Sequence, residues 1–363
     1  MVKGGLTTAA FRSYVSDIQE EVHQYFARWG NEGEADLYSA MCELVINTAS
    51  RTLLGQDVRS QLNDEVARLY HDLDLGFTPI NFLFPNLPLP RNIVRDRANL
   101  QLRELFVSVL RKRAARLEKL KAEGKEDSEV HHDMLNSLMN ATYKDGRSLS
   151  EVEVAGLMIA LLMAGQHTSS TSATWFGLYL LRDKEYLAKV MAEQESIFGD
   201  GKGGYVPLDF EGISNCDRLE YVLKEVLRLC PPIFQIMRTV TEDVYFNDMV
   251  IPAGSYVAVS PSVSSLDGKA FPNPNTFDPD RFSPERAEDS TEKNKGLYVP
   301  FGHGRHRCIG EPFAYLQIKT IWAAILQTFE LEPVGPMNQP NFNSMIVLPE
   351  TPCMVRYKRR VPL

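Results

Sequence analysis

The stretch that decides the fold is a glycine-rich loop that reads Phe301-Gly302-His303-Gly304-Arg305-His306-Arg307-Cys308-Ile309-Gly310. It runs directly into an apolar segment with helical periodicity, Glu311 to Phe329. We therefore expect Cys308 to sit where a helix begins, where unpaired backbone N–H groups and the helix dipole favour the thiolate. The glycines allow the backbone to approach a flat partner closely.

The chemistry of this loop suits a haem. A thiolate is an axial ligand of haem iron, and the cations Arg305, His306 and Arg307 would neutralise the haem propionates. A buried structural cysteine is the usual alternative for any single cysteine. The ten-residue context favours the ligand, so Cys308 is our candidate for the axial donor of haem b.

The composition narrows the class of protein. The chain has 363 residues, of which 44% are hydrophobic, which is enough for a deep core and too many for a disordered chain. A net charge of −8 argues against nucleic acid as a partner, because proteins that bind it present a basic field to the phosphates. The five cysteines form no C-x-x-C pair and signal neither a disulfide framework nor a structural zinc site. No apolar signal follows Met1, so the protein is soluble or its beginning is absent.

The longest uncharged stretch runs from Val154 to Leu181, 28 residues without Asp, Glu, Lys or Arg. Its length would allow a membrane span. However, Gln166 to Ser172 would place seven consecutive polar side chains at the bilayer centre, where unsatisfied polar groups are costly. The pattern predicts a long helix buried inside a globular protein, with a polar site halfway along it.

Helical periodicity also marks the first half of the chain, over Asp57 to Asp74 and Arg91 to Lys121. Between them, the prolines of Phe82 to Pro90 predict an apolar surface loop. The segment Arg91 to Lys125 that follows holds eleven basic residues against four acidic ones. An apolar loop beside a basic helix suggests contact with a membrane surface; a solvated helix face is the alternative.

The last third of the chain has a different sequence pattern. Beyond about residue 240, short β-branched runs alternate with prolines and turns, which predicts small sheets. Upstream of it, the glycine-rich loop Asp200 to Gly204 lacks the spacing of a phosphate-binding loop. Without a nucleotide-binding domain, reducing equivalents must come from another protein.

The loop that ends in Cys308 resembles the cysteine-ligand loop of the cytochrome P-450 superfamily, whose pattern is F-x-x-G-x-[RH]-x-C-x-G. Two further features of that superfamily follow in the right order, the E-x-x-R pair of Glu225 and Arg228 and the segment containing Arg281. The resemblance implies that these three side chains form a buried ionic triad that supports the haem loop. It also implies one catalytic domain over residues 1–363, mainly α with small β-sheets (α+β).

The polar centre of the long helix is similar to one branch of the superfamily. His167 stands where an acid usually precedes the threonine, here Thr168, and this substitution resembles the sterol 14α-demethylases. His306 fits the same branch. Further matches are Tyr70 to Phe77, Pro231 to Ile233 followed by Met237 and Arg238, Met345 and Ile346, and Tyr357 to Arg360.

The resemblance assigns roles to individual residues. Cys308 is the expected iron ligand, with Arg238, His306 and Phe301 as further cofactor contacts. Asp74 is the expected partner of His167, in an ion pair that opens as substrate binds. Histidine titrates near neutral pH, so His167 can pass protons to Thr168. The implied substrate contacts are Thr168 and the apolar residues Phe77, Ala164, Ile233, Met237, Met345 and Val347. Two departures from the family pattern are Gln235, in the strand expected to line the cavity, and His303 in the haem loop.

The implied reaction is three successive oxygenations of the 14α-methyl group of a sterol precursor, ending in its loss as formic acid. Electrons would come from NADPH through a separate cytochrome reductase, at the cytosolic face of the endoplasmic reticulum membrane. Two alternatives remain open, a haem-binding fragment without activity and a monooxygenase acting on another lipid. The polar centre of the long helix argues against a third, a helical membrane protein misread through one cysteine loop. Family members are longer, so we expect the membrane anchor and first helices to precede Met1, and this chain alone to bind haem weakly or not at all.

Overall fold

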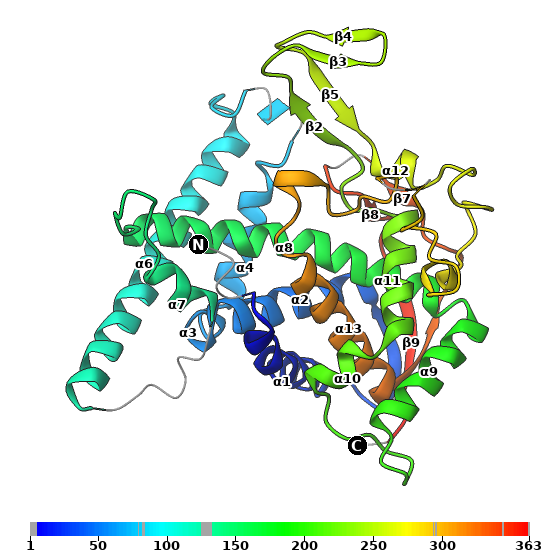
Figure 1. The fold of residues 1–363 in the computed structure, drawn as a ribbon. Helices are drawn as coiled ribbons and strands as arrows, with labels where there is room; N and C mark the ends of the chain where they lie inside the picture. Colours follow the sequence, from blue (N-terminus) through cyan, green and yellow to red (C-terminus); the bar gives the residue numbers. More distant parts are fainter. Residues whose placement is uncertain are drawn as a thin grey trace.

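The structure of the chain is a computed structural model that describes residues 6–78, 80–81, 84–124, 133–292, 294, 296–342 and 345–361. The longer helices are α1 (Thr8–Phe26), α2 (Leu37–Leu54), α4 (Asp64–Asp74), α6 (Pro90–Ala122), α8 (Glu151–Leu180), α9 (Lys184–Phe198), α11 (Asp217–Leu229) and α13 (Glu311–Thr328). Short helical segments are α3 (Gln56–Arg59), α7 (Met134–Met139), α10 (Phe210–Ser214), α12 (Pro261–Ser264), η2 (Pro279–Phe282) and η3 (Gly304–His306). The expected mainly α fold with small antiparallel sheets is confirmed (Figure 1).

The helix α8 crosses the middle of the molecule, with α2 and α13 packed beside it (Figure 1). It begins with a capping box, in which Ser150 Oγ accepts from the Glu153 N–H at 3.3 Å and Glu153 Oε2 accepts from the Ser150 N–H at 2.7 Å. Its second half is buried on all sides, which confirms a buried long helix. Two of the buried hydroxyls there donate to carbonyls one turn earlier, Ser172 to Thr168 O at 2.8 Å and Thr174 to Ser170 O at 2.7 Å, whereas the buried Thr171 Oγ1 has no hydrogen-bond partner among the described residues.

The contact between α8 and α13 is tight. The Trp322 ring stacks on Phe176 with centroids 5.3 Å apart, and its Nε1 donates to Ala173 O at 2.9 Å. Gly177 lies against the same ring and against Leu37 of α2, so closely that an added Cβ would overlap the ring. This packing fixes α13, and with it the loop that leads into α13, against the centre of the molecule.

The strands form four small antiparallel sheets among the described residues. They are β1 (Glu32–Asp36), β9 (Met354–Arg359) and β6 (Phe329–Pro333) in that order, β2 (Ile236–Thr239) with β5 (Tyr256–Val259), β3 (Val244–Phe246) with β4 (Met249–Ile251), and β7 (Pro340–Asn341) with β8 (Leu348–Pro349). The sequence pattern predicts sheets beyond about residue 240 and gives no sign of β1. Its residues Glu-Gly-Glu-Ala-Asp lack strand-forming side chains, and pairing with β9 overrides their local preference.

Three segments refine the predicted helices. The stretch Asp57 to Asp74 is divided into α3 and α4, because Asn63 caps α4 by accepting from the Val66 N–H at 3.0 Å. The predicted helix Arg91 to Lys121 is confirmed as α6. In the apolar segment before α6, residues 84–89 are non-helical, as expected. Phe82 and Leu83 of this segment lie outside the described residues, as does Lys125 at the end of the basic segment.

A membrane span requires a helix that is both long and apolar. Within the described ranges, no helix combines the length and the apolar character needed to cross a bilayer.

Candidate functional site

The loop before α13 presents its cysteine outward. Cys308 is exposed, and its N–H donates to Phe301 O at 2.9 Å, which closes the loop into a compact hairpin. Gly302 and Gly304 have φ values of +74° and +72°, a conformation that glycine adopts without strain. The helix α13 begins at Glu311 after Gly310, so Cys308 lies three residues before the first helical residue rather than at it. The turns of this loop, and not α13 itself, hold the sulfur.

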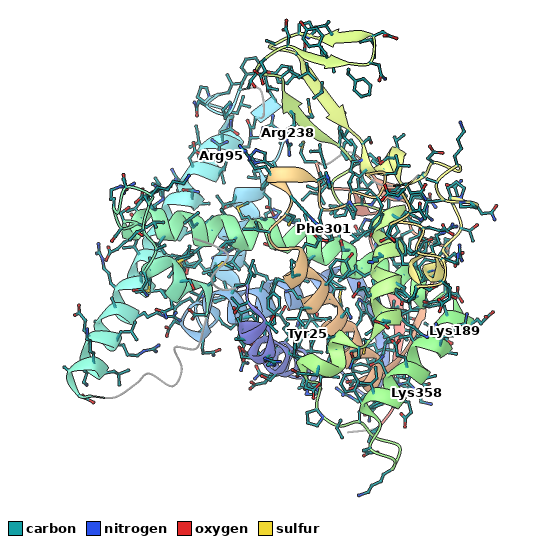
Figure 2. The ribbon with its side chains drawn as sticks, in the orientation of Figure 1. Tyr25, Arg95, Lys189, Arg238, Phe301 and Lys358 are labelled. Atoms are coloured by element: carbon teal, nitrogen blue, oxygen red, sulfur yellow. The ribbon has the colours of Figure 1, made fainter. Side chains whose placement is uncertain are left out.

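The loop lies beside the sheet formed by β2 and β5. A Cβ built on Gly302 would be 3.9 Å from Ile236 Cδ1, which places the loop next to the start of β2. Figure 2 shows Arg238 on β2 and Phe301 in the loop, with the η3 turn between them in this view. The Phe301 ring packs on Tyr315 of α13, with centroids 5.7 Å apart.

The cations expected beside Cys308 divide into two groups. Arg305 and His306 are exposed, as is Arg238. Arg307 instead forms two hydrogen bonds of 2.7 Å to the carboxylate of Glu311, and these bonds raise the pKa of the Arg307 guanidinium. Arg307 is thus exposed like the other two cations but paired with the first residue of α13, and its role as a counter-charge for a cofactor stays a prediction.

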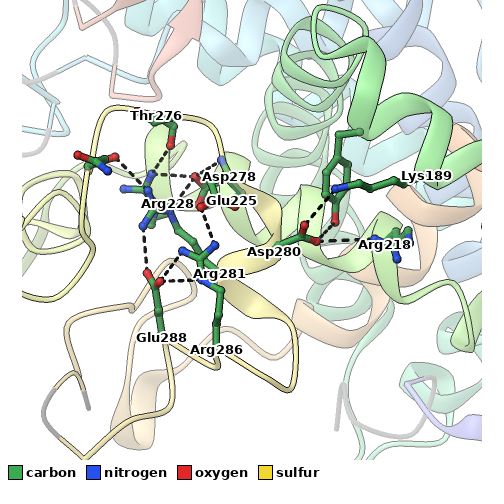
Figure 3. Close-up of polar contacts among 12 residues, drawn as sticks. Lys189, Arg218, Glu225, Arg228, Thr276, Asp278, Asp280, Arg281, Arg286 and Glu288 are labelled. Carbon is green, nitrogen blue, oxygen red and sulfur yellow. Dashed lines mark hydrogen bonds and ion pairs between the residues drawn. The ribbon is translucent and has the colours of Figure 1, made fainter.

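The predicted ionic triad is assembled and buried. Glu225 receives two hydrogen bonds from Arg228, at 2.7 and 2.8 Å, and lies 3.4 Å from Arg281 Nε (Figure 3). The side chains are 0%, 0% and 1% exposed, respectively. The Asp278 N–H donates to Glu225 Oε1 at 2.9 Å. Burial raises the pKa of Glu225, whereas the two guanidiniums and this N–H lower it and favour the carboxylate.

The triad extends further than the sequence motif. Arg281 also pairs with Glu288 at 3.0 Å, and Arg228 donates to Ser265 O at 3.0 Å and Thr276 O at 3.3 Å. Glu288 lies seven residues after Arg281 in an irregular segment, and its sequence gave no signal of this contact. The network ties α11 to the chain that runs toward the cysteine loop.

The polar centre of α8 meets the end of α4. His167 Nε2 lies 2.8 Å from Asp74 Oδ1, and the two side chains are 20% and 26% exposed. Asp74 is the last residue of α4. The structure thus brings together the two residues that the resemblance paired.

The neighbouring Thr168 is oriented by its own helix. Its hydroxyl donates to Ala164 O at 2.8 Å, so the lone pairs of Oγ1 remain able to accept a hydrogen bond. On the same turn, Ala164 is exposed, and a Cβ built on Gly165 would meet nothing within 4 Å. This part of α8 offers a flat and open surface beside the polar pair.

The expected substrate contacts are mostly accessible. Phe77, Ile233 and Met237 are 45%, 39% and 57% exposed, unusually open for large apolar side chains, and Met345 is half-buried. Val347 differs, because its side chain is only 2% exposed and its N–H donates to Pro232 O at 2.9 Å. In the structure Val347 anchors the segment that carries Met345 instead of presenting its own side chain.

Gln235 and His303, the two residues that depart from the family pattern, are both exposed. Gln235 lies one residue before β2, not within the strand expected to carry it, and His303 precedes the η3 turn.

These residues fit a haem. An exposed sulfur in a loop with two left-handed glycines, an open stretch of helix backbone at Gly165, and exposed cations at Arg238 and His306 match a flat apolar group with anionic substituents.

Comparisons with known proteins agree with this geometry. The sequence model of the family Cytochrome P450 matches residues 5–357. The chain is 43% identical to the lanosterol 14-alpha demethylase of Bos taurus, over 99% of this chain and 68% of that protein. It is 44% identical to the sterol 14-demethylase of Arabidopsis thaliana (96% and 70% covered) and 42% identical to the obtusifoliol 14-alpha demethylase of Sorghum bicolor (96% and 69%).

A solved structure shares the fold. The retinoic acid-bound cyanobacterial CYP120A1 superposes with a TM-score of 0.84 at 24% identity, covering 99% of this chain and 77% of that one. The match of the family model over nearly the whole chain, with relatives above 40% identity, confirms the resemblance read from the cysteine loop. The chain belongs to the cytochrome P450 family of haem-thiolate monooxygenases, among its sterol 14-alpha demethylases.

Proposed function

We propose that this chain oxidises the 14α-methyl group of a sterol precursor in three successive steps and releases that carbon as formic acid. The observation that carries the proposal is the pairing of His167 with Asp74 beside Thr168, at the open centre of α8. The 42–44% identity to sterol, lanosterol and obtusifoliol 14-alpha demethylases supports it.

Cys308 would be the axial ligand of haem b, with Arg238 and His306 at its propionates and Phe301 against its edge. When bound, the haem supplies the activation of dioxygen. The buried network of Glu225, Arg228 and Arg281 would support this loop from behind, since Glu225 is the carboxylate that both buried guanidiniums share and its removal would leave Arg228 without a counter-ion.

His167, Asp74 and Thr168 would handle protons. The 2.8 Å contact lets Asp74 hold the imidazole of His167 in one orientation. His167 would then pass a proton toward the neighbouring Thr168. Because the Thr168 hydroxyl already donates to Ala164 O, its oxygen can accept a hydrogen bond from a reacting group or a water. Opening of the ion pair on substrate binding would connect His167 with solvent.

Sterol binding would use the exposed apolar side chains around this point. Phe77 comes from the end of α4, Ile233 and Met237 from the start of the β2 region, Ala164 from α8 and Met345 from the segment before β8. Their apolar character suits a rigid polycycle. Val347 would act by fixing the backbone near Met345.

We further propose that the protein works at the cytosolic face of the endoplasmic reticulum membrane and receives electrons from NADPH through a cytochrome reductase. The exposed apolar residues Phe84, Ile93 and Val94 lie next to Arg91 and Arg97 at the start of α6. Apolar side chains among basic ones are suited to an anionic lipid surface.

The proposal is tested with the purified protein reconstituted with excess haem, because the chain alone is expected to bind haem weakly or not at all. A reduced, carbon monoxide difference spectrum should show the long-wavelength Soret band of thiolate ligation, and a 14α-methyl sterol should shift the iron spin state on titration. Incubation with NADPH and a reductase should then yield the demethylated sterol and formic acid. A thiolate spectrum without any sterol-induced shift would refute the substrate, and absence of the thiolate band in haem-loaded protein would refute Cys308 as ligand.

A further inference from the structure

Two buried asparagines form a reciprocal amide pair between Asn81, seven residues after the end of α4, and Asn92 in the first turn of α6. Asn81 Nδ2 donates to Asn92 Oδ1 at 2.9 Å, and Asn92 Nδ2 donates to Asn81 Oδ1 at 3.0 Å. The two residues are 7% and 1% exposed. Buried amides in this arrangement strongly favour one geometry, because a shift of either side chain breaks both bonds together.

Each amide uses its second hydrogen to hold the backbone. Asn81 Nδ2 also donates to Gly76 O at 3.0 Å, and Asn92 Nδ2 to Leu87 O at 2.8 Å. All four amide hydrogens therefore have an acceptor. The pair connects three points of the chain: the residues after α4, the residues before α6, and α6 itself.

The held carbonyl of Gly76 lies two residues after Asp74 and one before Phe77. The Gly76 N–H donates to Leu73 O and the Phe77 N–H to Asp74 O, each at 2.9 Å. The amide pair is thus linked through one carbonyl to the turn that carries Asp74.

Arg95 adds a second contact at the same place. It lies one turn after Asn92 on α6, and a Cβ built on Gly76 would be 2.5 Å from Arg95 Cδ. Its Nη2 donates to Pro85 O at 3.2 Å. Figure 2 labels Arg95 on α6. Two side chains on one face of α6, at positions i and i+3, therefore contact the segment that follows α4, Asn92 at Asn81 and Arg95 at Gly76.

We propose that Asn81 and Asn92 are positioning residues, which fix the end of α4 to α6 so that Asp74 stays within hydrogen-bond reach of His167. This inference rests on the proton-handling role proposed above for His167 and Asp74. It implies that any opening of the His167–Asp74 pair moves the end of α4 together with the start of α6, as one unit. The pair then acts on turnover without touching the substrate.

The test compares two ways of breaking the pair. The double variant Asn81→Leu/Asn92→Leu fills the space with apolar side chains and leaves Gly76 O and Leu87 O without donors. Asn92→Asp keeps the shape but cannot donate to Asn81 Oδ1 or Leu87 O. Asn99→Leu, at a half-buried position further along α6, is the matched control, because Asn99 contacts Arg103 and not the end of α4.

The first measurement needs no turnover. Hydrogen exchange of the Gly76 and Phe77 amides in the haem-loaded protein should become about tenfold faster in both pair variants and stay unchanged in Asn99→Leu. Unchanged exchange in both variants would overturn the proposal.

The second measurement is a double-mutant cycle with Asp74→Asn. If the pair acts through Asp74, the variants should lower kcat about tenfold in the parent and less than about twofold in the Asp74→Asn background, with KM for the sterol little changed in either. An equal loss in both backgrounds would show a merely structural role and refute the proposal. A parent that turns over no sterol would refute the proposed function instead, and the exchange result would still decide whether the pair holds α4.

Discussion

His167 Nε2 and Asp74 Oδ1 meet at 2.8 Å although 93 residues separate them in the chain. The contact joins the centre of α8, the helix that the rest of the fold surrounds, to the last residue of α4, which is held by α6. The central helix and the end of α4 are therefore joined by a side-chain hydrogen bond at the site.

Replacing His167 with alanine should leave haem and sterol binding within about threefold of the parent but lower kcat about 100-fold, because proton transfer loses its positioned donor. Turnover is measured with a saturating reductase, and binding by the spin-state shift. His71→Ala, at an exposed position on α4, should behave as the parent does. Near-normal turnover of His167→Ala would remove the residue from the mechanism.

Glu225→Ala should lower the free energy of unfolding by about 3–5 kcal/mol, because Arg228 and much of the charge of Arg281 would remain buried without a counter-ion. Urea unfolding followed by circular dichroism measures the change. The control is Arg218→Ala on the same helix, whose side chain is 37% exposed and 3.7 Å from Asp280, and which should cost less than about 1 kcal/mol. Equal effects of the two changes would contradict a supporting role of the triad.

Gly177→Ala should destabilise the fold by about 1–3 kcal/mol. The added methyl overlaps the Trp322 ring, which cannot retreat because it is stacked on Phe176 and bonded to Ala173 O. Gly156→Ala on the same helix meets nothing within 4 Å and should instead stabilise by about 0.5–1 kcal/mol. Thermal unfolding shows whether each variant is less or more stable than the parent. An unchanged stability of Gly177→Ala would show that the contact between Gly177 and Trp322 is looser than described.

The cysteines should differ in reactivity. Burial raises the pKa of Cys216, Cys230 and Cys353 to about 12 each, so at pH 8 only about one thiol in ten thousand is a thiolate. Iodoacetamide should leave these three unlabelled until the pH approaches about 12. Exposed Cys308 should react at pH 8 in haem-free protein and be protected by haem. Peptide mass spectrometry measures the labelling, and protection of a different cysteine by haem would refute Cys308 as the ligand.

The sequence predicted the parts of the fold that rest on local pattern. The uncharged run with polar residues in its middle indicated α8, and the loop ending in Cys308 indicated the haem site. Charged residues were harder to place. Glu32 and Glu34 became a strand only because β9 pairs with them, and Arg307, read as a counter-charge, is paired with Glu311 one helical turn ahead.

Contacts between distant segments had no local signal. The pairing of Asp74 with His167 came from family resemblance and not from spacing. Asn81 and Asn92 look like ordinary residues near a proline-rich loop, and only the fold shows them buried against each other. Val347 was expected to face the substrate, yet the backbone bond to Pro232 buries it, because the direction of a side chain in an irregular segment depends on its neighbours.

The order of the strands β1, β9 and β6 has a consequence for biosynthesis. The strand in the middle, β9, follows both β1 and β6 in the chain, so both outer strands are synthesised before the strand that pairs with them. Until β9 has been synthesised, β1 has no strand to pair with. Its acidic side chains then disfavour pairing of its open edge with other chains. The sheet therefore closes only after β9 has been made, so removal of residues 354–359 would leave both β1 and β6 without their shared partner strand and should make the chain a substrate for chaperones.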